Sequence, residues 1–266
     1  MRGDDRVRPN AAGLLLYGRD GAAKVIDTSN GRVNKVVTVF GMAGGVGTTT
    51  VAALLGRVMA KWRLPTVLVD ANLYAPRLAQ AVQVEPGSAS LERFASWRGL
   101  EPLRVDATLG LVPGLHDLRK THMVRTAEIL ALLDGLAGTV RIVDTAPFFG
   151  DEVVYATLRC ATDVVVVAED VSGSIRQMAR YRRLFEQIRM PWDRALLVVN
   201  HSRPGPDAGI AWEDETGIAP VCVLPWQSVG GYVVTDSFLR AGEALARAVL
   251  GGVSMAKPGG AAWAPA

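Results

Sequence analysis

Residues 36–55 place an apolar strand, a glycine-rich turn and a helix-forming segment directly after one another. The strand covers residues 36–40, the turn contains Gly44, Gly45 and Gly47, and an Ala/Leu-rich helix is expected from about Thr48. Glycines let the backbone curl until several N–H groups point at one position, and a helix N-terminus adds its positive end. The stretch therefore predicts a cradle for a phosphate group.

The nearest sequence pattern is the P-loop, G-x-x-x-x-G-K-[ST], and the match is incomplete. Met42 stands where the first glycine belongs, and Thr48 stands where the lysine belongs. A variant of this loop, x-K-G-G-x-G-K-T-T, aligns without a gap and puts Ala43 in place of its first lysine. The segment resembles the deviant Walker A motif of the ParA/MinD family with both lysines replaced. The glycines and the hydroxyl of Thr49 are retained, so the loop keeps its scaffold and loses two positive charges.

The rest of the chain alternates short apolar runs with helical patterns, which indicates a mostly parallel, doubly wound sheet. We expect one α/β domain of the P-loop NTPase type, with its sheet flanked by helices. Strands are expected at residues 36–40, 66–70, 109–113, 140–144, 163–168, 195–200 and 221–224. Helices are expected at residues 48–62, 123–136, 173–189, 208–216 and 236–249, with a short one within 86–105. Residues 71–79 are expected to be a loop that passes into a helix.

Three segments are expected along the chain. Residues 1–34 form an N-terminal extension, polar and disordered at first, with a small hairpin between residues 14–17 and 23–27. Residues 35–250 form the P-loop NTPase-like domain. Residues 251–266, rich in Gly, Ala and Pro, are expected to be a flexible tail.

Composition narrows the class of protein. At 266 residues the chain is long enough for one domain with a sizeable core, and its net charge of +3 is too small to indicate nucleic acid by itself. The two cysteines, Cys160 and Cys222, lie beside apolar runs and lack metal-ligand spacing. No stretch approaches the roughly 18 apolar residues of a membrane span, and no signal peptide fits the N-terminus. We expect a cytoplasmic protein.

Three parts are needed for phosphoryl transfer at a P-loop. Backbone amides hold the phosphate, a lysine neutralises charge, and Mg²⁺ lies on a loop hydroxyl and a carboxylate at a strand end. Amides are available between Gly44 and Thr49, and we expect Thr49 and Asp144 to hold Mg²⁺. Many buried strands end in a capping Asp, but the P-loop about a hundred residues earlier favours the functional interpretation of Asp144.

The resemblance also assigns the acidic residues. Asp70 matches the first acid of the family's D-x-D segment and is the one catalytic candidate, while Asn72 replaces the second acid. An amide cannot act as a base at neutral pH. Ala43 replaces the lysine that reaches across the dimer, and Thr48 replaces the lysine that holds the phosphates. The resemblance therefore implies that the catalytic parts are degenerate.

For the nucleotide, Asn200 matches the residue that contacts adenine, and Pro225 lies in the segment that closes over the base. A cap on a turn is the alternative role for Asn200. The resemblance implies ATP and Mg²⁺ as cofactors, with ATP binding weakened or lost. The expected nucleotide-binding residues are Gly44, Gly45, Val46, Gly47, Thr48, Thr49, Thr50, Asn200 and Pro225.

Within the family, residues 73–78 and 110–114 resemble the TadZ/CpaE group, which marks sites of Flp-type pilus assembly. That group carries a receiver-like domain before the P-loop, whereas 34 residues precede the loop strand here. The branch implies a homodimer with protein partners in a pilus or secretion machine. Helix 173–189 carries five arginines beside Tyr181, and we favour a solvated helix face over nonspecific DNA binding.

Two functions follow from this pattern. The first is a spatial-positioning or assembly protein with little or no ATP hydrolysis. The alternative is an active ATPase that works in DNA partition or in cell-pole or septum positioning. The alternative needs a cation in place of the lysine, and Lys35, Arg77 or an arginine of a partner are the candidates.

Overall fold

The computed structural model describes residues 14–17, 23–26, 34–96, 101–136, 139–187, 195–200, 209–225 and 235–251. The strands are β1 (Leu14–Tyr17), β2 (Ala23–Ile26), β3 (Lys35–Gly41), β4 (Thr66–Ala71), β5 (Leu103–Arg104), β6 (Leu109–Val112), β7 (Val140–Thr145), β8 (Asp163–Glu169), β9 (Ala195–Asn200) and β10 (Cys222–Leu224). The helices are α1 (Thr48–Lys61), α2 (Leu78–Val82), α3 (Leu91–Ser96), η1 (Leu118–Met123, 3₁₀), α4 (Thr126–Gly135), α5 (Glu152–Cys160), α6 (Ser172–Gln187), α7 (Gly209–Thr216) and α8 (Asp236–Val249).

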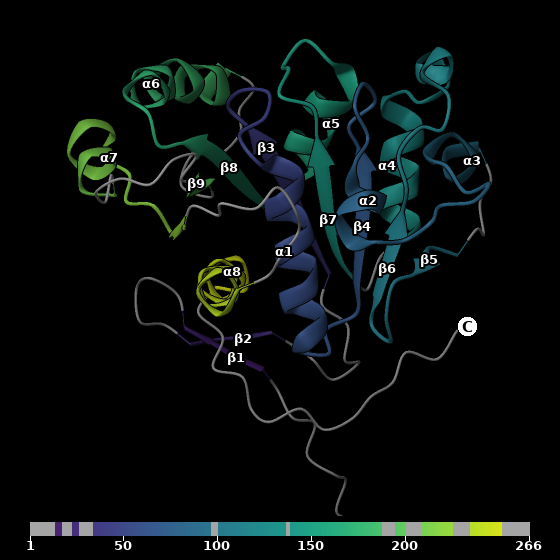
Figure 1. Ribbon diagram of the computed structural model, residues 1–266, viewed down its shortest axis with the longest axis horizontal. Coiled ribbons are helices and arrows are strands. Elements are labelled where there is room, and N and C mark those ends of the chain that lie inside the picture. The colour runs from purple at the N-terminus through teal and green to yellow at the C-terminus, as the bar shows by residue number, and fades with distance from the viewer. Residues whose placement is uncertain are drawn as a thin grey trace, which may run out of the picture.

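Eight of the described strands form one sheet in the order β10-β9-β8-β3-β7-β4-β6-β5, and every pair except β5–β6 is parallel (Figure 1). The expected single, mostly parallel, doubly wound sheet is confirmed. β3, which leads into the phosphate loop, lies in the middle of the sheet between β7 and β8. A loop at the end of a central strand is supported by neighbouring strands on both sides.

Helices cover both faces of this sheet, and alternate strand residues serve the two faces. Val37 and Val39 of β3 pack with α1, α2 and α8, whereas Val36 and Phe40 point to the other side. That second side is covered by α3, α4, α5, α6 and α7. Because both faces of the sheet are buried, the strands have continuous apolar sequences. In β8, for example, every residue from Val164 to Ala168 is buried.

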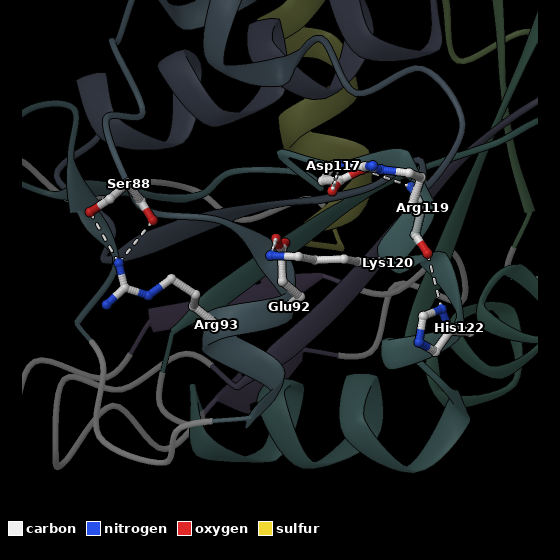
Figure 2. Close-up of polar contacts among 7 residues, drawn as sticks. All are labelled: Ser88, Glu92, Arg93, Asp117, Arg119, Lys120 and His122. Carbon is white, nitrogen blue, oxygen red and sulfur yellow. Dashed lines mark hydrogen bonds and ion pairs between the residues drawn. The ribbon is translucent and has the colours of Figure 1, made fainter.

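The connection between β6 and α4 is fixed by short polar contacts, which Figure 2 shows. The ammonium of Lys120 in η1 lies 3.5 Å from the carboxylate of Glu92 in α3, a side chain that is only 4% exposed. Asp117 begins η1 by accepting hydrogen bonds from the backbone N–H and the guanidinium of Arg119. Those bonds, led by the one from the Arg119 side chain, lower the pKa of Asp117 to about 2. The segment is therefore held against α3, and the ring nitrogen of His122 contacts the Arg119 carbonyl within it.

Three described elements were not expected from the sequence: α5, η1 and the two-residue strand β5. The first residue of α5, Glu152, is followed by two valines, which are poor helix formers. The N-terminus of the helix is fixed by Asp151, whose carboxylate accepts from the N–H groups of Val153 and Val154. β5 pairs antiparallel with β6 at the edge of the sheet. Tertiary pairing, rather than local propensity, creates it.

At the N-terminal side, β1 and β2 pair with each other in an antiparallel two-stranded sheet. The expected disorder of residues 1–10 and the expected flexible tail, apart from Gly251, lie outside the described residues. The division of the chain at residues 34 and 250 stays a prediction. Among the helices that the structure describes, none has the length and the apolar character required to cross a membrane.

Candidate functional site

The glycine loop curls at the carboxyl end of β3 because two of its glycines adopt conformations that side chains rarely allow. Gly45 has φ of 85° and Gly47 has φ of 95°, both in the left-handed region. Gly47 also precedes the first residue of α1, and no side chain caps the N–H groups of that first turn. A Cβ on Gly41 would lie 2.2 Å from Thr48 Oγ1, so the base of the loop requires a glycine as well. The loop therefore offers free backbone N–H groups at a helix N-terminus.

Thr49 and Asp144 meet at the inner wall of this loop. The Thr49 hydroxyl donates a 2.7 Å hydrogen bond to Oδ2 of Asp144. The other oxygen of this fully buried carboxylate, Oδ1, has no hydrogen-bond partner in the described part of the chain. A hydroxyl beside a carboxylate oxygen that still lacks a partner is the donor set of a hard cation such as Mg²⁺. The residues present therefore fit the cation that the loop motif implies.

Asp70 lies beside Asp144 because β4 and β7 pair in register at these two residues. Its carboxylate is buried and accepts hydrogen bonds from the backbone N–H groups of Leu78, at 2.8 Å, and Asn72, at 3.3 Å. Burial raises the pKa of Asp70 to about 7, against the lowering effect of these backbone bonds. Burial first, and then the charge of Asp70, raise the pKa of Asp144 well above its usual value, while the Thr49 hydroxyl lowers it. Two carboxylates thus share one buried site.

A pocket of about 760 Å³ includes Thr49 in its lining, whereas the buried carboxyl groups of Asp70 and Asp144 do not line it. It is lined by the glycine loop and its three threonines, by the turn after β4, and by residues 145–148 after β7. All expected loop residues line it except Val46, whose side chain is 2% exposed. Asn72 lines it too, at the position of the missing acid. The volume lies within the range of small-ligand sites.

Of the two candidates in this chain for a cation that replaces the loop lysine, Lys35 and Arg77, one lies at the pocket and one does not. Lys35 begins β3, at the opposite end of the strand from the loop, and its ammonium pairs with Asp163 at 2.9 Å. Seven residues of strand span about 20 Å, so Lys35 is excluded as a partner for phosphate in the pocket. Arg77 does line the pocket, and it is the only ionised side chain among the lining residues that the structure describes.

Asn200 reaches the loop, although it follows it by 154 residues. Its Nδ2 donates a 2.9 Å hydrogen bond to the Val46 carbonyl and packs where a Cβ on Gly47 would lie. This amide therefore holds the loop in shape, and its proposed contact with adenine stays a prediction. Pro225 follows β10 and is not among the residues that line the pocket.

Sequence patterns do not indicate the residues that support the glycine loop or those at the rim of the pocket. The Tyr181 hydroxyl in α6 donates a hydrogen bond to the Met42 carbonyl, and its ring belongs to an aromatic cluster with Phe40, Phe149 and Phe185. Tyr74 and Phe148, both more than half exposed, line the pocket at its outer side. An aromatic residue next to a turn at a strand end is the only local signal that could have indicated the rim.

The helix that carries the arginines packs with its apolar side on the sheet. Ile175, Met178 and Phe185 of α6 are buried, whereas its arginines at positions 176, 180, 182 and 183 are exposed. Arg189 lies outside the described residues. This arrangement agrees with a solvated basic face, and DNA binding by that face is not tested by it.

Comparisons with known proteins place the fold. No protein-family profile matches the sequence, and no curated protein matches it significantly. Solved structures do match: a ParA family ATPase from Chlorobium tepidum TLS has a TM-score of 0.69 at 14% identity, over 82% of this chain and 99% of that one. MinD from Pyrococcus horikoshii OT3, solved with Mg-ADP, has a TM-score of 0.69 at 16% identity, over 82% and 96%.

A complex of MinC with MinD from Aquifex aeolicus gives a similar result, with a TM-score of 0.65 at 18% identity over 86% of this chain and 100% of that one. At such identities the likeness establishes the fold. The chain thus has a P-loop NTPase fold, and within that class it has the fold of the ParA/MinD ATPases.

Proposed function

We propose that this chain is a ParA/MinD-like spatial-positioning or assembly protein whose nucleotide site binds weakly and hydrolyses ATP little or not at all. The observation that carries the proposal is the pocket itself. The glycine cradle and the Thr49–Asp144 pair are intact, while Ala43, Thr48 and Asn72 stand at the positions that supply charge and base in the ParA/MinD pattern. Structural neighbours were solved with Mg-ADP and with AMPPNP, which supports nucleotide as the ligand class.

Each residue of the site has a physical role in this proposal. The loop N–H groups from Gly44 to Thr49 would hold phosphate oxygens, and Thr49 with Asp144 would hold Mg²⁺, which supplies neutralising charge when bound. Asp70 accepts two backbone hydrogen bonds and fixes the turn after β4. Asn72 cannot take a proton from water. The site therefore binds and positions, and it lacks a base at the position where the pattern has its second acid.

Titration calorimetry with ATP·Mg²⁺, together with a phosphate-release assay, tests this proposal. We expect weak binding and negligible turnover, because charge that develops in the transition state is stabilised chiefly by preorganised cations and donors. Submicromolar affinity with steady hydrolysis that Asp144→Ala abolishes would contradict the proposal. That result would support the alternative, an active ATPase in DNA partition or in cell-pole or septum positioning.

For partners, we propose a homodimer that docks proteins of a Flp/Tad-type pilus or secretion machine. The support is the sequence resemblance to the TadZ/CpaE group together with the exposed rings of Tyr74 and Phe148, 55% and 59% exposed, beside the pocket. Light scattering with and without ATP·Mg²⁺ tests the dimer, with Phe148→Ser as the variant. A chain that stays monomeric at high concentration in both conditions would contradict it.

A further inference from the structure

Among the residues that the structure describes, Arg77 is the one charged side chain that lines the glycine-loop pocket. It immediately precedes α2, at the end of the turn after β4, and it lines the same pocket as the glycine loop. The other side chains that line this pocket, among the described residues, are apolar, hydroxyl-bearing or amide groups. An anion in the loop would therefore find one full positive charge in its pocket.

The guanidinium of Arg77 is also free to bind. Lys35, Lys61 and Lys120 are each paired with a carboxylate. Within the described residues, no ion pair or side-chain hydrogen bond is formed by Arg77, which is exposed. Ligand binding would not have to break an internal pair first.

The backbone that carries this arginine is held firmly. Asp70 accepts from the Leu78 N–H at 2.8 Å, a backbone bond from Arg77 also contributes to its pKa, and the Arg77 carbonyl accepts from the Ala81 N–H at 2.9 Å. A Cβ on Gly114 would lie 2.2 Å from the Cβ of Pro76, so the segment after β6 packs closely against the same turn. The buried carboxylate beside Asp144 thus anchors the residue that projects the charge.

We infer that Arg77 is the residue that pairs with the phosphate oxygens of the ligand, in place of the two lysines that the loop lacks. A guanidinium presents a planar fork of donors that matches two phosphate oxygens, and it stays charged at any physiological pH. The inference rests on the proposed function in one respect, that the ligand carries phosphate. It identifies the charge that makes weak binding possible at this site, and it requires no hydrolysis.

A second pocket of about 460 Å³ also includes Arg77 in its lining, together with Pro76 of the same turn. Asp70 and Glu85 both line that pocket, and their carboxyl groups are the competing partners for the guanidinium. Within the described residues, Arg77 forms an ion pair with neither of them. Arg77 therefore stands between two pockets, with its charge uncommitted to either.

Titration calorimetry on the full chain tests the inference, with ADP·Mg²⁺ and with inorganic pyrophosphate as probes. Arg77→Ala should lower the affinity for both probes by about ten- to hundredfold, which is the effect of losing one charge-assisted hydrogen bond. Arg77→Lys should recover part of the affinity, because it restores charge without the fork. Arg240→Ala is the matched control: it removes the same charge from an exposed position of α8 that does not line the pocket, and should change affinity less than twofold.

Thermal unfolding of each variant accompanies the titrations, since an exposed side chain should leave the melting temperature unchanged. Equal affinity of Arg77→Ala and the unaltered chain would overturn the inference, as would equal losses in Arg77→Ala and Arg240→Ala. Absence of any binding by the unaltered chain would overturn it too, together with the weak nucleotide binding in the proposed function, while the proposed lack of hydrolysis would stand. Steady hydrolysis by the unaltered chain would instead contradict the proposed function. The affinities of Arg77→Ala and Arg240→Ala would still decide the inference in that case.

Discussion

Asp70 and Asp144 occupy paired positions on the adjacent parallel strands β4 and β7, and both carboxylates are buried. Adjacent parallel strands are about 4.8 Å apart, so two negative charges at this register would repel strongly in a site that excludes water. One of the two is bound to the Thr49 hydroxyl, and the other to backbone N–H groups. Burial raises the pKa of both carboxyl groups, so the pair favours a bound proton in the absence of metal, and a divalent cation would instead favour the ionised pair.

This pairing predicts a dependence of stability on pH. The pKa of Asp70 rises from 3.8 to about 7 on folding, mainly because burial disfavours the charge. Between these values the folded chain holds a proton that the unfolded chain releases, so the free energy of unfolding falls as pH rises from about 4 to 7. Asp70→Asn should flatten this fall. In the absence of metal, the free energy of unfolding of the native chain should fall by up to about 4 kcal/mol more than that of the variant across this pH window.

Urea unfolding at several pH values, in chelator, measures that difference. Glu101→Gln removes an exposed carboxyl group and serves as the control. Added Mg²⁺ should reduce the fall, because the cation favours the ionised pair. Identical pH profiles for the native chain and Asp70→Asn would contradict the prediction.

The fold and the core of the site could be predicted because their signals are local. A buried apolar run predicts a strand, a run of glycines predicts a tight loop, and an acid at a strand end reaches the carboxyl edge of a parallel sheet. From these rules alone, the loop, Thr49, Asp70 and Asp144 are expected at one edge of the sheet. The register that makes the two acids direct neighbours follows from sheet order, which sequence periodicity does not contain.

The residues that support the glycine loop could not be predicted, because they depend on contacts between segments that are distant in the sequence. The bond from Asn200 to the Val46 carbonyl joins residues 154 apart, and the bond from Tyr181 to the Met42 carbonyl joins residues 139 apart. Neither partner has a local pattern that indicates the contact. For α5, the local signal was present in Asp151 as a helix cap, but the valines that follow it favour strand.

The close approach of Asn200 to the loop predicts coupling between positions 47 and 200. Gly47→Ala should destabilise the chain by about 1–3 kcal/mol, because φ is 95° there and the new Cβ would lie 2.4 Å from Asn200 Nδ2. Asn200→Ala should cost about 1 kcal/mol through the lost bond to Val46. The double variant should cost less than the sum, because the small side chain relieves the clash.

Denaturant unfolding of the four proteins gives this coupling energy directly. The strain of the backbone remains in the double variant, so stability should not return fully to the native value. Strict additivity would show that the amide does not press on the loop.

The basic face of α6 predicts weak nucleic-acid binding that depends steeply on salt. Each phosphate neutralised by an arginine releases counterions, so affinity from an exposed charged face falls as salt rises. We expect binding at low ionic strength that vanishes near physiological salt, measured by fluorescence anisotropy with a random duplex. Tight, salt-resistant binding that is lost when Arg180, Arg182 and Arg183 become Ala would contradict the assignment of α6 as a solvated face.

Restoring the lysines is the most direct test of the loop. A contact between lysine and phosphate is a charge-assisted hydrogen bond of roughly 1.5–3 kcal/mol. Ala43→Lys combined with Thr48→Lys should therefore raise the affinity for ATP by about two to four decades, at about 1.4 kcal/mol per decade. Calorimetry measures this change. Ala43→Met with Thr48→Met adds comparable length without charge and should leave affinity low.

The two lysines should restore binding more fully than hydrolysis, because the added charges stabilise the bound ground state as well as the transition state. Turnover should need Asn72→Asp in addition, since an amide cannot act as a base and Asp70 is already engaged by backbone N–H groups. Phosphate release by the lysine variant with and without Asn72→Asp measures this step. If the lysine variant gained neither affinity nor turnover, the glycine loop would not be a phosphate cradle, and the free N–H groups at the start of α1 would serve another ligand.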